Sequence, residues 1–438
     1  MKKLMALALS SVMVLGLAAC GQKTEKKPAT NATTGKVAST KAAESKKPEN
    51  KETGKNSAKP LVWWNRQPSN SSTGELDKEA LNFNKNTRYV GFDANQGAEL
   101  QGEMIKKYIE KNIEKIDRNK DGVIGYVLAI GDVGHNDSVA RTRGVRKALG
   151  TAVEKDGQIV SDPAGTNTDG SSKVVKDGEL EIGGKKYKVR ELASQEMKTS
   201  AGATWDAPTA GNAISTWSAS FGDQIDVIAS NNDGMGMAMF NAWSNEKKVP
   251  TFGYDANQDA VEAIKAGYGG TISQHADVQA YLTLRVLRNA LDGVDMKTGI
   301  DDKDDAGNVL SKDVFKYVEK DKSYYALNVA VTAENYKDYL DSTKTYAPVS
   351  KQLDEAKHPK KKIWLNSYNS ADNFLGSTYL PLLKKYQKLL NLDVDYVDGD
   401  GQNESTITNR LGDPSAYDGF AVNMVKTDNA ASYTQLLK

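Results

Sequence analysis

Two short segments on either side of one apolar run carry residue types that could do chemistry. The first, DRNKDGVIG (residues 117–125), places Asp117, Asn119 and Asp121 at alternate positions, with the carbonyl of Val123 next in the series. Hard cations such as Ca²⁺ prefer oxygen ligands, which alternate loop residues can supply while Gly122 permits a sharp turn. Asp, Asn and Gly are also the ordinary residues of surface turns, so this spacing leaves both a metal site and a plain turn open.

The second segment, GDVGHNDSVAR (residues 131–141), follows the apolar run YVLAI. An apolar run that stops at a Gly-rich turn is typical of a strand leading into a helix, and in open α/β sheets ligands sit beyond the carboxyl ends of the strands. His135, Asp137 and Arg141 can converge at such a place. The same cluster would also serve as a helix N-cap with solvated neighbours, so by itself it does not decide between the two roles.

The elements that must position these residues alternate between strand-like and helix-like patterns. This alternation predicts an α/β fold with parallel, doubly wound sheets, organised as two Rossmann-like lobes that are joined by a hinge and enclose a cleft. One exception is the stretch 178–192, where alternation around Gly183 and Gly184 predicts an added β-hairpin. The strand-like runs are residues 61–65, 87–93, 122–131, 225–233, 249–255, 269–274, 362–368 and 417–424.

The N-terminus has the pattern of an exported lipoprotein. Residues 1–19 begin with Met-Lys-Lys, continue with a short apolar stretch and end in small residues, which is typical of a secretory signal and too short for a comfortable membrane span. Cys20, the single cysteine, resembles the lipidated first residue of bacterial lipoproteins. Residues 20–59 contain almost no large apolar side chain, so we expect a flexible tether. We therefore expect a protein without disulfides, outside the cytoplasm, anchored to the cell membrane through lipid alone.

The charge balance excludes one class of partner. The chain has 58 Lys and Arg against 57 Asp and Glu, which leaves no electrostatic footprint for nucleic acid. The export signal and the lack of an N-terminal helix-turn-helix also disfavour a DNA-binding regulator. The roughly 380 residues after the tether are enough for two domains with sizeable cores.

The order of the two loops around their strand resembles the periplasmic glucose/galactose-binding proteins of ABC transporters, a group of type I periplasmic binding proteins, and the match continues over essentially everything from Lys59 onward. The resemblance implies a site in which two aromatic plates hold a sugar face and a belt of polar side chains bonds the hydroxyls. The implied sugar-binding residues are Asn65 in WWNRQP, His135, Asp137 and Arg141 in GHNDSVAR, Trp205 in ATWD, Asn232 in ASNND, Asp255 in FGYDA, Gln274 in the hinge segment, and Tyr368, Asp372 and Phe374 in NSYNSADNF.

The last of these motifs lies in an unexpected place. In the family it opens the chain, whereas here it follows residue 360, so the sequence resembles a circular permutant whose old termini are joined through a linker. Chain termini commonly lie at the surface, which makes such a cut tolerable. The implied divisions are a lipoprotein signal peptide (1–19), a lipidated tether (20–59), part of lobe A (60–92), lobe B (93–272), the hinge with a lobe A helix (273–314), a further part of lobe B (315–340), the joining linker (341–362) and the rest of lobe A (363–438).

The implied metal site departs from the family's pattern. Gly125 stands where the family has a ligand-bearing Gln, and the shorter Asp226 stands where it has a bidentate Glu. Fewer protein oxygens mean weaker binding, so we expect structural calcium, the one cofactor implied, to bind more weakly than is usual in the family. Gln274 replaces an Asn, which keeps the amide but moves it by one methylene.

The resemblance implies a substrate-binding protein of an ABC sugar importer, with a monosaccharide, most simply glucose or galactose, as ligand and the permease subunits as partners. Paired carboxylates in a cleft are also the equipment of glycoside hydrolases, so an enzyme is the main alternative from another class. A receptor for another small solute on the same fold is a third. The donor-rich belt and the tether supply no reactive group, so we expect the chain not to be an enzyme.

Overall fold

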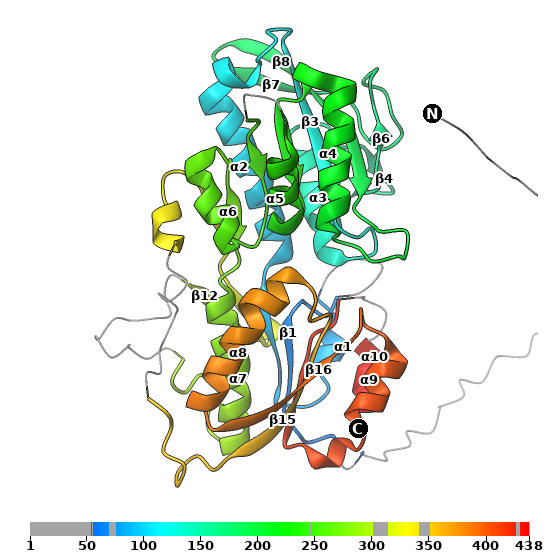
Figure 1. Cartoon of the computed structure of the whole chain (residues 1–438). Coiled ribbons are helices and arrows are strands. Elements are labelled where there is room, and N and C mark those ends of the chain that lie inside the picture. Colours follow the sequence, from blue (N-terminus) through cyan, green and yellow to red (C-terminus); the bar gives the residue numbers. More distant parts are fainter. Residues whose placement is uncertain are drawn as a thin grey trace, which may run out of the picture. The chain divides into compact units, whose positions relative to one another are not determined.

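The computed structural model describes residues 54, 56–69, 76–244, 248–300, 314–340, 351–425 and 430–437 (Figure 1). The fold below concerns the unit Thr53–Lys438. Cys20, the signal segment and most of the tether lie outside the described residues. Within the described part of the chain, no helix is both long and apolar enough to span a membrane.

A seven-stranded sheet is the centre of lobe A. Its strand order is β12-β13-β2-β1-β17-β15-β16, and all neighbours are parallel except β12 and β13. The strands are β1 (Leu61–Asn65), β2 (Thr87–Phe92), β12 (Phe315–Val318), β13 (Ser323–Ala326), β15 (Lys361–Ser367), β16 (Leu392–Asp398) and β17 (Gly419–Val422).

Alternation along β1 sends its side chains into two different cores. Val62 and Trp64 pack with helices α7 (Ala276–Asp292) and α8 (Leu380–Leu389), whereas Leu61 and Trp63 pack on the opposite face. That second face is covered by α1 (Lys78–Leu81), α9 (Glu404–Leu411) and α10 (Ala430–Leu436) (Figure 1). Because successive strand residues point to opposite faces, the four consecutive apolar residues Leu61 to Trp64 indicate a strand that is covered on both sides.

Lobe B is built on a six-stranded sheet. Five of its strands follow the order β10-β9-β3-β8-β6, and the sixth, β7, also pairs with β8. The predicted hairpin is confirmed, because β7 and β8 are antiparallel and Gly183 and Gly184 between them have φ of 60° and 78°. Its strands are β3 (Val123–Ile130), β6 (Gly165–Thr166), β7 (Gly178–Ile182), β8 (Lys185–Glu196), β9 (Val227–Ser230) and β10 (Thr251–Phe252), and a separate pair is formed by β4 (Glu154–Lys155) and β5 (Gln158–Ile159).

Helices cover both faces of this sheet, as expected for a doubly wound fold. On one face lie α2 (Ala94–Ile116) and α3 (Asn136–Ala148). These two helices pack so closely that a Cβ atom on Gly144 would lie 2.2 Å from the carbonyl oxygen of Ala98. The other face carries α4 (Ala207–Phe221) and α5 (Asp233–Ala242), and α6 (Gln258–Ala263) lies beside α5. The two predicted Rossmann-like lobes are therefore present.

The chain passes between the lobes at three places. It crosses between β2 and α2, between β11 (Thr271–Ser273) and α7, and between β13 and β14 (Val329–Val331). Strands β11 and β14 pair antiparallel, which brings two of these crossings side by side. If the lobes move relative to one another, the backbone of these three crossing segments would have to change conformation.

The placement of residues 315–340 differs from the sequence-based expectation. We expected this whole stretch in lobe B, but β12 and β13 belong to the lobe A sheet, where Ser323 pairs with Tyr89. Only β14 and the turn η4 (Tyr336–Tyr339) lie with lobe B. The expected neighbour of β1 is present, since Leu61 pairs with Phe420 of β17 in parallel.

Candidate functional site

The predicted site residues of lobe B lie at the carboxyl ends of its strands. His135 follows β3 and is the N-cap of α3, its Nδ1 accepting a hydrogen bond of 3.1 Å from the backbone N–H of Asp137. Asn232 follows β9 and caps α5 in the same way, through Met235. The cap and the site are thus the same residues. Two helix N-termini, which favour negative charge and acceptors, meet there.

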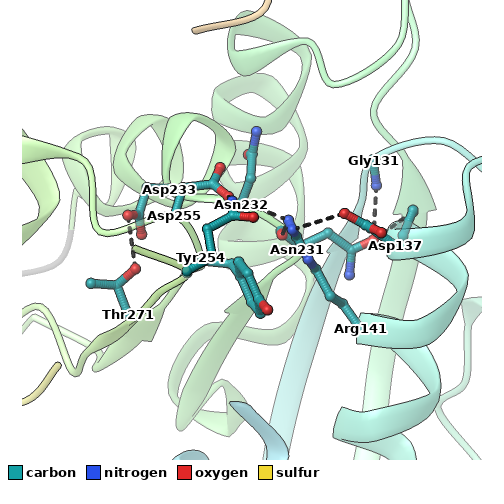
Figure 2. Close-up of polar contacts among 12 residues, drawn as sticks. Gly131, Asp137, Arg141, Asn231, Asn232, Asp233, Tyr254, Asp255 and Thr271 are labelled. Carbon is teal, nitrogen blue, oxygen red and sulfur yellow. Dashed lines mark hydrogen bonds and ion pairs between the residues drawn. The ribbon is translucent and has the colours of Figure 1, made fainter. Parts of the chain in front are cut away.

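Arg141 stands at the centre of this group (Figure 2). One of its terminal nitrogens lies 3.3 Å from Oδ2 of Asp137, and the other lies 3.7 Å from Oδ1 of Asp255. Its guanidinium carbon is 3.6 Å from the ring centroid of Tyr254, a stacked arrangement that holds the plane of the group. The structure therefore brings three of the predicted residues into one buried ion network.

Arg66 adds a second guanidinium from the end of β1. Its Nε is 2.7 Å from Oδ2 of Asp137, its Nη1 donates to Oδ1 of Asn65 at 2.9 Å, and the same nitrogen is 3.5 Å from Oε1 of Gln274. Sequence reasoning missed this residue, although it stands beside Asn65 in WWNRQP. A charge next to a predicted ligand at a strand end was the available signal.

The carboxyl groups of the site differ in protonation because their surroundings differ. Burial opposes the ionisation of Asp137, but Arg66 and Arg141 outweigh it and hold its pKa below the ordinary value. Burial raises the pKa of Asp255 to about 7, with Arg141 opposing the shift and Asp372 adding to it. Burial lowers the pKa of His135 to about 4, so its ring is neutral at pH 7. At pH 7, Asp137 is therefore an anion that accepts hydrogen bonds, whereas Asp255 is near the midpoint of its titration.

Asn231 organises the turn after β3 and was also missed. Its Oδ1 accepts from the backbone N–H of Gly131 at 3.1 Å and from the hydroxyl of Ser138 at 2.7 Å, while its carbonyl accepts from Arg141 at 2.7 Å (Figure 2). It is fully buried. In the motif ASNND the first Asn positions the loop and the second caps the helix, a division that the letters alone do not reveal.

Trp205 lies over the same turn. Its backbone has a φ of 61°, its indole is 5.0 Å from the His135 ring in an edge-to-face arrangement, and a Cβ atom on Gly131 would fall 2.3 Å from the indole. Only a glycine can therefore stand at position 131 without moving the tryptophan. The indole is partly buried, which leaves an apolar plate at the edge of the polar cluster.

Lobe A contributes three of the predicted residues to the neighbourhood. Asn65 ends β1 with a φ of 65° and is buried, and the Tyr368 ring lies 6.2 Å from that of His135. Asp372 accepts from the backbone N–H of Leu375 at 2.9 Å, and burial raises its pKa. Gln274, at the second crossing, donates to Oδ1 of Asp255 at 2.8 Å.

Phe374 has a different environment from the one expected for a stacking plate. It is 3 % exposed, belongs to the core between the lobe A sheet and its helices, and packs edge-to-face on Tyr379 with ring centroids 5.9 Å apart. Its place in the core follows from the helical turn that begins just after Asp372, which directs this ring toward α7 and α8. Its role as a plate stays a prediction.

The predicted metal loop is partly satisfied by its own groups. Asp121 accepts from the backbone N–H of Val123 at 2.8 Å and from Asn119 at 3.0 Å, and Asp226 accepts from the N–H of Gly125 at 2.9 Å. Among the described residues, no three His, Cys, Asp or Glu side chains gather as a metal cluster.

Two carboxylate oxygens at the predicted metal site have no hydrogen-bond partner among the described residues. Oδ1 of Asp117 and Oδ1 of Asp226 are buried without a hydrogen bond among the described residues, and burial raises the pKa of Asp226 to about 7. The Nε of Arg118 lies 3.8 Å from Oδ1 of Asp226, which is too far for a hydrogen bond. These two carboxylate oxygens would suit a cation. The guanidinium of Arg118 already places a positive charge near Asp226.

Comparison with protein families gives two matches. A family model described as periplasmic binding protein domain matches residues 76–295, half of the chain, and a second model with the same description matches residues 360–430.

Among curated proteins, the chain is 27% identical over 241 residues to the D-galactose/methyl-galactoside binding periplasmic protein of Haemophilus influenzae, covering 53% of this chain and 57% of that protein. It is 34% identical over 99 residues to the xylitol-binding protein of Mycolicibacterium smegmatis, covering 22% of this chain and 28% of that one. The chain thus spans about half or less of the length of these relatives.

Among solved structures, an ABC transporter periplasmic solute binding protein from Actinobacillus succinogenes with bound D-allose matches with a TM-score of 0.38 and 18% identity, covering 60% of this chain and 69% of that chain. The Caulobacter myo-inositol binding protein bound to myo-inositol matches with a TM-score of 0.35 and 17% identity, covering 57% and 62% respectively.

Proposed function

The chain belongs to the periplasmic binding protein family, and we propose that it binds a monosaccharide, glucose or galactose, for an ABC sugar importer. The observation that carries the proposal is the polar cluster around Asp137, in which side chains from both lobes converge at the strand ends. The family is one of binding proteins and not of enzymes, in agreement with the expectation from the sequence. The galactose, allose and inositol named for the similar proteins are all polyhydroxylated rings.

The chemistry of the cluster suits such a ring. A hexopyranose presents C–H groups on its faces and hydroxyls around its edge, so it needs a flat apolar plate and a belt of oriented polar groups. Trp205 offers the plate. Asp137, as an anion, accepts hydroxyl protons strongly, and Arg141 and the neutral His135 donate. The remaining predicted belt members are Asn65, Asn232, Asp255, Gln274, Tyr368 and Asp372.

A calorimetric titration of the full chain with glucose, galactose, allose, ribose, xylitol and myo-inositol tests the proposal. We expect saturable one-to-one binding of glucose or galactose, tighter than that of the other members of the panel. Absence of binding by all six would overturn it. Incubation with nitrophenyl glycosides tests the hydrolase alternative, and any turnover above that of buffer would favour an enzyme.

We also propose that the mature protein is held at the outer face of the cell membrane by a lipid on Cys20, with the permease subunits as partners. The support is the signal-like stretch before Cys20 and the tether-like composition after it. Mass spectrometry of the mature N-terminus checks the lipid. A Cys20→Ser variant should be released from the membrane fraction while binding sugar as the parent does.

We further propose that the chain is a circular permutant of the family's usual order. The support is the position of NSYNSADNF after residue 360 and the parallel pairing of β1 with β17, which joins the two ends of the described chain within one sheet. A rearranged gene that encodes residues 361–437, then 56–340, should give a protein with the same sugar affinity. An insoluble product, together with a soluble parent, would count against the proposal.

Calcium is the last part of the proposal. We infer that the loop 117–125 binds calcium more weakly than the family's usual site, because Gly125 offers no side chain and Asp226 reaches less far than Glu. Asp117, Asn119, Asp121, the carbonyl of Val123 and Asp226 would hold the ion. A large upward shift of the melting temperature at micromolar free calcium, reversed by chelator, would contradict the expected weak affinity for calcium.

A further inference from the structure

A crevice of about 960 Å³ borders the proposed sugar site. Asp255 lines the crevice and also accepts a hydrogen bond from Gln274 within the site. Asn373, which follows the predicted site residue Asp372 in the sequence, lines it as well. The crevice therefore opens directly from the cluster. We propose that it is a second sugar subsite, so that the ligand is a disaccharide or another glycoside with a bulky neutral substituent. This inference rests on the proposed function.

The size of the crevice exceeds the need of a single hexose. Small-molecule pockets enclose roughly 300–1,000 Å³ for ligands of drug size, and a hexose has only twelve heavy atoms. Trp205, His135 and Arg141 are not among the residues that line the crevice. The space therefore adds to the monosaccharide site and does not replace it.

The lining offers the same two kinds of group that recognise a sugar. Tyr339 is half-buried at the end of η4, and its ring lies 6.4 Å from that of His275, so two flat surfaces stand together. Asn257 is 5 % exposed, and its buried Oδ1 has no hydrogen-bond partner in the described part of the chain. A ring hydroxyl could supply the missing donor, because buried polar atoms are normally paired.

The charge of the crevice selects among second units. Three aspartates besides Asp255 line it, Asp259, Asp277 and Asp338, against the single lysine Lys385. A substituent that carries a carboxylate or phosphate would meet like charges in a partly desolvated space, which is unfavourable. A neutral sugar unit is not penalised in this way.

The test is calorimetry on the full chain with glucose and galactose, and then with the neutral disaccharides lactose, melibiose, cellobiose and maltose. We expect at least one disaccharide to bind tenfold or more tightly than its own monosaccharide units. If the monosaccharides bind and no disaccharide binds more tightly, the subsite is refuted while the proposed function stands. If no sugar of either kind binds, both fail.

Two variants locate the gain. Tyr339→Ala should reduce it to less than threefold and leave the monosaccharide dissociation constant unchanged, whereas Tyr336→Ala on the same turn, outside the crevice, should leave both unchanged. Ser377→Trp places an indole into the crevice from an exposed position, so it does not depend on the packing of η4. It should abolish the gain as well. A gain that survives both Tyr339→Ala and Ser377→Trp would overturn the placement.

Discussion

The Nε of Arg66 lies 2.7 Å from Oδ2 of Asp137, and this ion pair joins the end of a lobe A strand to the first turn of a lobe B helix. Both side chains are nearly buried, at 12% and 3% exposure. Burial would lower the pKa of Arg66, but Asp137, Asp255 and Asp372 outweigh it and raise it. The guanidinium thus binds the acceptors that we propose for sugar hydroxyls. A ligand must share them with Arg66 or displace it.

Replacing this guanidinium should loosen the contact between the lobes. Arg66→Met keeps an apolar stem beside Phe92 but removes a charged hydrogen-bonding group, worth about 1–3 kcal/mol. In the ligand-free state the variant should have a larger radius of gyration by small-angle X-ray scattering than the parent, and saturating sugar should make the two alike. Arg66→Lys, which keeps the charge, is the control. Identical scattering of Arg66→Met and parent without ligand would contradict the role of the pair.

The sugar pocket itself can be tested by removing a plate or a belt member. Trp205→Ala should cost about 2–4 kcal/mol of binding free energy, because stacking area is lost without leaving a buried charge. Asp255→Ala should also weaken binding strongly, since sugar hydroxyls that had given up water would lack a partner. Calorimetry with glucose and galactose measures both, and Glu181→Ala, on the exposed hairpin, is the matched control. Parental affinity in both variants would place the pocket elsewhere.

The alternation of apolar runs was enough to predict the lobes, because period and flanking turns are local properties. It was not enough to find Ser323–Ala326, which is not among the predicted strands and which lies in the lobe A sheet between β12 and β2, with Ser323 paired to Tyr89. Which strands pair depends on contacts between residues far apart in the sequence, and a local pattern does not contain that information.

The site shows a similar division. His135, Asp137 and Arg141 could be predicted together because one strand-turn-helix unit carries them. Arg66 could not be paired with Asp137 in advance, because their separation depends on how the lobes close. Phe374 has the right type and neighbours for a plate, yet the turn after Asp372 buries it in the core. The local amino-acid sequence does not determine which way a side chain points at the start of a helix.

Asp255 should make stability depend on pH. Burial raises its folded pKa to about 7, above the unfolded value, so its contribution is fully present below about pH 4 and is lost as the pH rises through 7. Asp255→Asn removes the charge without removing the acceptor for Gln274. Its melting temperature should exceed that of the parent at pH 8 by about 2–4 °C for each kcal/mol relieved, and the difference should vanish near pH 4. A difference independent of pH between 4 and 8 would refute this assignment.

Arg118 should limit calcium binding, because its guanidinium supplies positive charge where the ion would bring it. In Arg118→Leu the buried oxygens of Asp117 and Asp226 lose that charge, so the pKa of Asp226 should rise further and the metal-free protein should be less stable. Added calcium should then stabilise the variant more than the parent, since binding to the folded state alone raises its stability. Thermal melts with calcium and with chelator measure both effects. Lys115→Leu, which removes an exposed charge in the last turn of α2, controls for net charge. A calcium response of Arg118→Leu no larger than that of Lys115→Leu would show that Arg118 does not stand in for the cation.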